Sequence, residues 1–159
     1  MARFVARLMA RLSNQIAIVI CALMGISQAN AKAEPARWQR EGNGITASLT
    51  GQPGDAARGR LIVADRRKGL CLLCHSGPFP EERFQGTLAP SLSGVGIRMN
   101  AAEIRLRLVD SRMVNSATIM PAYFSTHNLV QVASNFRDRT ILSASEIEDV
   151  IAFLLTLKE

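Results

Sequence analysis

Apolar positions near the end of the chain repeat with the period of an α-helix. Just before this repeat, Ser143 and Glu146 stand three residues apart, which is the spacing of a capping box at a helix N-terminus. The repeat follows the i, i+3, i+4, i+7, i+8 pattern of a buried helix face, and its members are Ile147, Val150, Ile151, Leu154 and Leu155. We therefore predict an amphipathic helix over residues 143–157.

Two weaker helical patterns lie upstream. The first runs from Gly54 to about Arg67, and its apolar positions at helix spacing are Ala57, Leu61, Ile62 and Ala64. The second covers residues 100–107, where Asn100 is a candidate N-cap and Glu103 occupies the capping-box position. Both patterns predict helices that present one face to a common core.

The segments between these helices are long and rich in turn residues. Residues 76–96 contain seven glycines and prolines, and residues 111–126 are irregular and include Met120-Pro121. A short helix is expected within residues 127–136. Because no segment alternates apolar and polar residues as a strand does, we expect an all-α fold whose long ordered loops carry function.

The N-terminus has the features of a secretory signal. Three arginines fall within the first 11 residues, residues 16–26 are apolar, and a small-x-small sequence ends at Ala31. A second such site ends at Ala33. A membrane anchor is the alternative, but the apolar stretch is shorter than the ~20 residues that span a bilayer. We predict that residues 1–31 are removed on export to the periplasm, which leaves no membrane anchor.

The mature chain divides into an N-terminal extension, residues 32–53, and one domain, residues 54–159. The extension is polar and contains the sole tryptophan, Trp38, which we interpret as an anchor against the domain or a partner. Loss of the signal removes three arginines and no acids, so 16 basic residues face 13 acidic ones, a net charge of +3. No basic stripe with interleaved aromatic residues is present, so we expect no nucleic-acid partner.

Two cysteines remain after cleavage, and the residue that follows them indicates their chemistry. Cys71, Cys74 and His75 form CxxCH, the attachment motif of c-type haem. Two thiols one helical turn apart reach the two vinyl groups on one edge of the porphyrin, and the adjacent imidazole reaches the iron. A thioredoxin-type redox pair would need a βαβ context, and structural zinc would need four ligands.

The motif makes His75 the proximal iron ligand, and its other ring nitrogen needs a hydrogen-bond acceptor. The candidate acceptor is the backbone carbonyl of Pro90. For the distal ligand we favour Met120, because the rigid proline after it fixes the approach of the thioether and a thioether raises the reduction potential. His127 is the alternative, while the two other methionines of the domain are interpreted as packing residues: Met99 and Met113.

The order of these features resembles class I cytochrome c. In that family the first and last helices cross at a small residue, which here would be Gly59 against Phe153 or Leu154. Gly59 lies 12 residues before Cys71, a longer spacing than is usual there.

A narrower resemblance covers residues 54–157. The runs 68–90 and 118–123 look like SoxX, the monohaem subunit of the SoxAX cytochrome of bacterial sulfur oxidation. The resemblance implies a periplasmic L-cysteine S-thiosulfotransferase complex that joins thiosulfate to a cysteine of the SoxYZ carrier. The SoxX subunit would hold one haem c, receive electrons from SoxA and pass them to a diffusible cytochrome c. The catalytic cysteine would lie on SoxA.

Three other functions stay open at this point. They are a free cytochrome c shuttle without an enzyme partner, a thiol–disulfide oxidoreductase, and a haem sensor with an open coordination position. In the loop 77–88, Phe79 and Phe84 are expected either to form a partner surface or to line the haem pocket.

Overall fold

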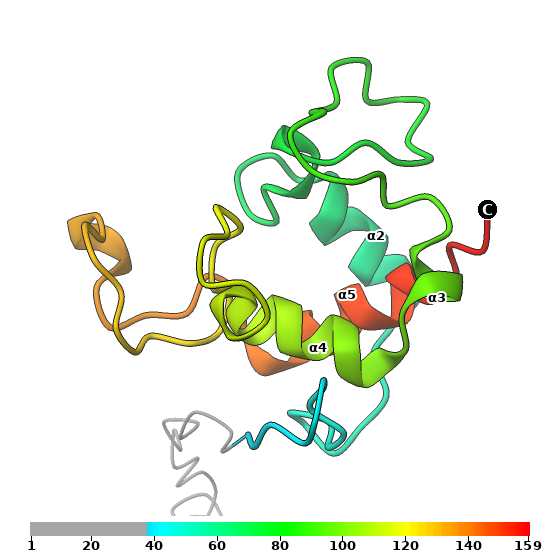
Figure 1. The fold of residues 1–159 in the computed structure, drawn as a ribbon. Coiled ribbons are helices and arrows are strands. Elements are labelled where there is room, and N and C mark those ends of the chain that lie inside the picture. Colours follow the sequence, from blue (N-terminus) through cyan, green and yellow to red (C-terminus); the bar gives the residue numbers. More distant parts are fainter. Residues whose placement is uncertain (1–37) are drawn as a thin grey trace, which may run out of the picture. The chain divides into compact units, whose positions relative to one another are not determined.

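The structure, a computed structural model, describes residues 38–159, and the predicted signal segment lies outside the described residues. Within residues 38–159 the helices are α2 (Ala56–Ala64), α3 (Val95–Arg98), α4 (Ala101–Asp110) and α5 (Ala144–Leu154), joined by long loops (Figure 1). Three 3-10 turns accompany them: η1 (Cys71–Leu73), η2 (Ser111–Met113) and η3 (Ser134–Phe136). The described residues contain no strand beyond one isolated bridge between Glu41 and Gly44, so the all-α prediction is confirmed.

Helices α2 and α5 cross at Gly59, as the resemblance to class I cytochrome c implies. A Cβ at this position would lie 1.9 Å from the carbonyl oxygen of Asp149 and 2.9 Å from Cβ of Phe153. No residue larger than glycine fits such a crossing without moving a helix. The carboxylate of Asp149 adds polar links across it, because it accepts hydrogen bonds from the Asp55 amide at 2.6 Å and the Arg58 Nε at 2.8 Å.

The face of α2 that enters the core agrees with the prediction only in part: Ile62 is buried and Ala64 packs against the core, as predicted. Ala57 and Leu61 are exposed, whereas Gly59, Ile62 and Val63 are buried. The close approach at Gly59 sets the rotation of the helix, and the residues one turn later on that side therefore point inward. The apolar spacing alone placed Ile62 and Ala64 correctly but not Ala57 and Leu61, because this helix is only weakly amphipathic.

Both predicted capping boxes are present. Asn100 and Glu103 exchange hydrogen bonds at the start of α4, and Ser143 and Glu146 do so at the start of α5. The helix ends lie about one turn away from the predicted ones. Helix α4 continues to Asp110 because its second half is buried, and α5 ends at Leu154.

The chain beyond α5 turns back toward α3. The carbonyl of Leu157 accepts a hydrogen bond from the Gly96 amide at 2.9 Å, and Lys158 Nζ donates to the Gly96 carbonyl at 2.7 Å. Figure 1 shows the C-terminus beside α3. This contact explains why the helix predicted to residue 157 stops earlier, and α3 itself was not predicted.

The short helix expected within residues 127–136 is wrong apart from the 3-10 turn at its end. Asn128, Gln131 and Asp138 have left-handed backbone conformations, with φ of 53°, 55° and 55°. Each such residue interrupts a right-handed helix. The segment instead extends away from the helices as an exposed loop (Figure 1).

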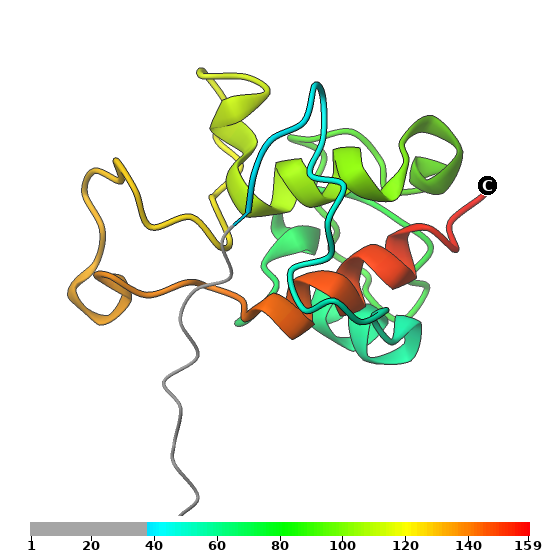
Figure 2. The same cartoon turned by 90° about the horizontal axis from the view of Figure 1, so that it is seen from below.

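The described part of the N-terminal extension, residues 38–53, packs on the domain. Ile45 and Leu49 are buried, and the Ile45 amide donates to the Ala102 carbonyl at 3.0 Å. Figure 2 shows this segment running across α4 and α5. Trp38 is partly buried against the same core, which fits its interpretation as an anchor. No helix among residues 38–159 is long and apolar enough to cross a membrane.

Candidate functional site

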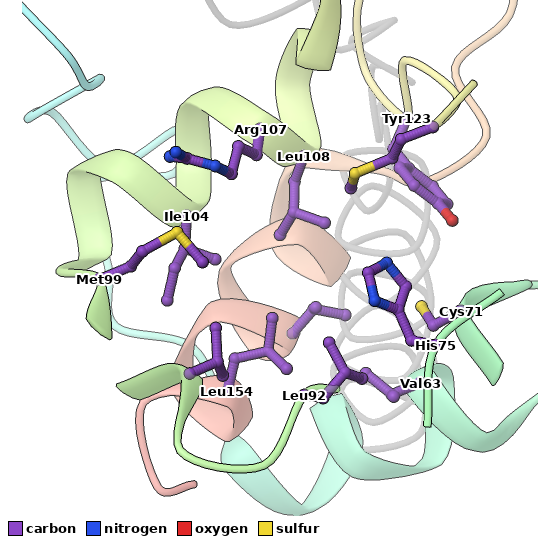
Figure 3. A pocket seen from close by; sticks show the side chains of 13 residues that line it. Val63, Cys71, His75, Leu92, Met99, Ile104, Arg107, Leu108, Tyr123 and Leu154 are labelled. Carbon is purple, nitrogen blue, oxygen red and sulfur yellow. The ribbon is translucent and has the colours of Figure 1, made fainter. Parts of the chain in front are cut away.

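A pocket lies between the three longer helices and the loops that connect them (Figure 3). It holds about 560 Å³ of empty space, part of which opens to solvent. Its wall is mostly apolar, with contributions from each helix and a loop: Val63, Ile104, Leu108, Val150, Leu154 and Leu92.

The imidazole of His75 projects into this pocket (Figure 3). The turn η1 delivers it, since the His75 amide donates to the Cys71 carbonyl at 2.9 Å. On the other side of the ring, Nδ1 lies 2.6 Å from the carbonyl oxygen of Pro90, the acceptor that the sequence suggested. A carbonyl only accepts, so Nδ1 carries a proton, and in the neutral ring Nε2 then keeps its lone pair. That is the form of histidine that binds a metal ion.

Cys71 lies beside His75 on the pocket wall. Burial raises the pKa of its thiol to about 11, and the thiol donates a hydrogen bond to the Gly69 carbonyl at 3.2 Å. Cys74 is partly buried and is not among the lining residues. The two thiols are not joined in a disulfide.

Met120 lines the same pocket as His75. Its backbone is held from two sides: the Ser111 hydroxyl donates to the Met120 carbonyl at 2.6 Å, and the Met120 amide donates to the Thr118 hydroxyl at 3.1 Å. His127, the alternative ligand, is exposed and lies outside the lining residues. The structure thus brings together the favoured pair of ligand candidates.

The other two methionines differ from each other. Met113 lies outside the pocket, partly buried against the core, as the packing interpretation requires. Met99 packs against the core as well, but it also forms part of the pocket wall. Its position directly before the cap of α4 explains this, because that helix supplies one side of the pocket.

Among the lining residues that sequence reasoning missed, two are polar. Arg107 is the only lining residue with a permanent charge, and it follows Ile104 by three positions on the pocket side of α4. The helical period could have identified it. Tyr123 is buried, and its hydroxyl donates to the Gly69 carbonyl at 2.7 Å, a contact 54 positions away in the chain. No sequence pattern marks such a contact.

The two phenylalanines of the loop 77–88 have separate environments, so neither expectation holds for both. Phe79 is 1% exposed and packs edge-on against Phe153, with ring centroids 5.7 Å apart. The guanidinium carbon of Arg60 lies 5.0 Å from the centre of the Phe79 ring. Phe84, by contrast, is 82% exposed. Phe79 therefore belongs to the core outside the pocket, and only Phe84 contributes to a surface.

Comparison with known proteins identifies the family. One chain of the crystal structure of SoxXA from P. pantotrophus matches with 35% sequence identity and a TM-score of 0.71. The match covers 79% of this chain and 97% of that chain. This chain belongs to the SoxX family. No family model matches the sequence, and neither does any curated protein.

Membership of the SoxX family confirms the resemblance seen in residues 68–90 and 118–123. The helical architecture is consistent with a cytochrome c-like fold. In this SoxX chain the pocket offers one imidazole nitrogen and two thioethers in an apolar wall, with a thiol at its side. Within residues 38–159, no group of three or more His, Cys, Asp and Glu side chains is placed to hold a metal ion. An imidazole and a thioether that border one apolar pocket are a donor set suited to a metal that brings its own ligand plane.

Proposed function

We propose that this SoxX chain is a periplasmic c-type cytochrome with one haem, the electron-transfer subunit of a SoxAX complex. The observation that carries the proposal is the shared pocket of His75 and Met120, with the His75 ring held by Pro90 and the Cys71 thiol at its side. The family relationship to a chain of SoxXA supports the assignment to such a complex.

The residues of the pocket fit a haem. Two protein donors complete the coordination of an iron whose other four ligands come from a porphyrin. The apolar wall suits the porphyrin faces, and the fixed positive charge of Arg107 suits a cofactor that carries carboxylates. Cys71 and Cys74 would hold the haem through thioether bonds, and His75 and Met120 would bind its iron.

The haem would supply a site that accepts and releases one electron at a time. This chain's own residues set the conditions for that exchange. The Pro90 carbonyl fixes the tautomer and orientation of His75. With haem bound, the Met120 thioether would favour the reduced iron and the buried aliphatic wall would lower access of water, so both would raise the reduction potential.

The chain itself would not perform the sulfur chemistry. Both of its thiols would be consumed as haem attachments, so the nucleophile and the catalytic cysteine belong to the SoxA subunit. Joining thiosulfate to the SoxYZ cysteine forms one S–S bond and releases two electrons. In this proposal the SoxX chain receives them singly and delivers them to an acceptor cytochrome c, within an L-cysteine S-thiosulfotransferase.

An exposed apolar surface beside the attachment turn supports a partner at this end of the pocket. Phe84 and Leu88 are 82% and 76% exposed, and Leu73 within the CxxCH turn is 43% exposed. The Gly86 amide donates to the Leu72 carbonyl at 2.9 Å and holds the loop against the turn. Exposed apolar clusters of this kind commonly mark protein contacts.

Purification of the exported chain with its native partners tests the proposal. We expect a covalent c-type absorption spectrum and co-purification of a second haem-containing chain. A covalent spectrum in a stably monomeric chain would favour the free electron shuttle instead. A chain exported and matured normally without covalent haem would overturn the proposal.

A further inference from the structure

The phenol of Tyr123 connects the two parts of the chain that carry the proposed iron ligands. Tyr123 follows Met120 by three residues, and its hydroxyl donates to the carbonyl of Gly69, two residues before Cys71, at 2.7 Å. The side chain is 3% exposed and lines the pocket. In Figure 3 it lies on the same side of the pocket as Cys71 and His75.

The backbone of Tyr123 forms hydrogen bonds with α4 and with the segment that leads to α5. The Tyr123 amide donates to the Leu108 carbonyl at 3.0 Å, and its carbonyl accepts from the Ile141 amide at 2.9 Å. Within residues 38–159, no other residue of the segment 118–125 forms a hydrogen bond with the segment 65–76. The phenol therefore provides the polar link between the methionine side and the attachment side of the pocket.

The Gly69 carbonyl depends on this phenol more strongly once Cys71 has reacted. In the free chain it accepts from the Cys71 thiol at 3.2 Å as well as from Tyr123. A thioether sulfur has no proton to donate. With Cys71 alkylated, Tyr123 is the side-chain donor that remains for a buried carbonyl, and loss of its hydroxyl leaves that carbonyl without a side-chain partner.

We propose that Tyr123 is a positioning residue for Met120: its hydrogen bond to Gly69 holds the methionine segment against the attachment segment and keeps the thioether on the iron. The inference rests on the proposed function, since it requires haem in the pocket. Removal of the hydroxyl leaves the ring packing and the ties to α4 in place. Without the hydroxyl, the segment 118–125 that carries Met120 separates more readily from the segment 65–76, although the fold is retained.

Imidazole binding to the ferric, exported full-length chain tests this inference, because imidazole enters only when the thioether leaves. In the Tyr123→Phe variant we expect about tenfold tighter imidazole binding than in the wild type. We also expect a lower reduction potential, because a weaker thioether bond favours the reduced iron less. A purely structural role would lower the melting temperature without changing either quantity.

Phe79→Leu is the matched control, because Phe79 is a buried aromatic residue of the core outside the pocket lining. It should lower stability and leave imidazole affinity at the wild-type value. Wild-type affinity in Tyr123→Phe, or an equal increase in both variants, would overturn the inference while the haem assignment stands. A wild-type chain without covalent haem would overturn the proposed function and this inference together.

Discussion

The two sides of helix α4 differ in what their side chains contact. On the side away from the pocket, Arg105 and Glu148 form a buried ion pair with Nε–Oε1 and Nη2–Oε2 distances of 2.8 Å. The same pair binds the N-terminal segment, since Arg105 donates to the Ile45 carbonyl at 2.7 Å and Glu148 accepts from the Leu49 amide at 2.9 Å. Protein groups satisfy every polar atom of this cluster.

On the pocket side, the same helix contributes Ile104, Arg107 and Leu108 to the pocket wall. Arg107 donates a hydrogen bond to the Glu103 carbonyl of the same helix at 3.0 Å, whereas no ion pair like that of Arg105 and Glu148 lies on this side of α4 within residues 38–159. Under the proposed function, protein groups complete the core on one side of α4, and the haem would complete it on the other.

The largest expected effect comes from removing the cofactor attachment. The double variant Cys71→Ala/Cys74→Ala should lose covalent haem and expose the pocket wall to water. We expect it to lose most of its native stability, which for a domain of this size is about 5–15 kcal/mol. Thermal unfolding followed by circular dichroism measures the loss, and a wild-type melting temperature would show that the pocket side is also complete without a cofactor.

The next effect concerns the opposite side of α4. Glu148→Gln leaves the buried Arg105 charge without its carboxylate, and breaking such a pair costs about 3–5 kcal/mol. Because Glu148 also binds the Leu49 amide, the N-terminal segment should become sensitive to proteases. Glu81→Gln is the control, because its pair with Arg60 is solvent-exposed. Equal stability of the two variants would contradict the account of this side.

A smaller effect is expected at the crossing that supports both sides. Gly59→Ala places a Cβ against the Asp149 carbonyl and forces α2 and α5 apart, at a cost of about 1–3 kcal/mol. Chemical denaturation measures this cost. Ala57→Gly, on the exposed face of the same helix, separates helix propensity from the steric effect. An alanine at position 59 with wild-type stability would mean that the helices do not cross there.

The smallest expected effect is a pH dependence. The hydrogen bond from Arg58 lowers the pKa of Asp149 in the folded chain below its ordinary value. A carboxylate whose pKa is lowered by folding stabilises the native state at pH values above its unfolded-state pKa of about 3.9. This stabilisation is lost as the pH falls through the lower pKa of the folded state. The free energy of unfolding, measured by denaturation at several pH values below 5, should decrease as the pH falls. In Asp149→Asn this decrease should be smaller, by an amount that corresponds to at most one proton. An unchanged pH dependence in this variant would show that Asp149 does not contribute to unfolding in acid.

Features that depend on a few neighbouring residues were predictable from the sequence. Both capping boxes need only residues three positions apart, and the CxxCH motif places Cys71 and His75 in one turn. The contact between His75 and Pro90 was expected from the motif's chemistry and a proline in the adjoining loop.

Features that depend on distant partners were not predictable. Arg105 and Glu148 are 43 positions apart, and each looks like an ordinary charge on a helix surface. The left-handed residues Asn128, Gln131 and Asp138 lack the glycine that usually announces a turn. The buried face of α2 is selected by its contact with α5, which no local pattern reveals.

The most direct test of the central claim is the near-infrared absorption of the ferric protein, where a thioether bound to iron gives a weak band. Wild type and the Met99→Ala variant should both show this band, and Met120→Ala should lose it while keeping covalent haem. Met99→Ala controls for loss of a lining thioether, since both methionines border the pocket. A band that persists in Met120→Ala, or disappears in Met99→Ala, would contradict iron ligation by His75 and Met120.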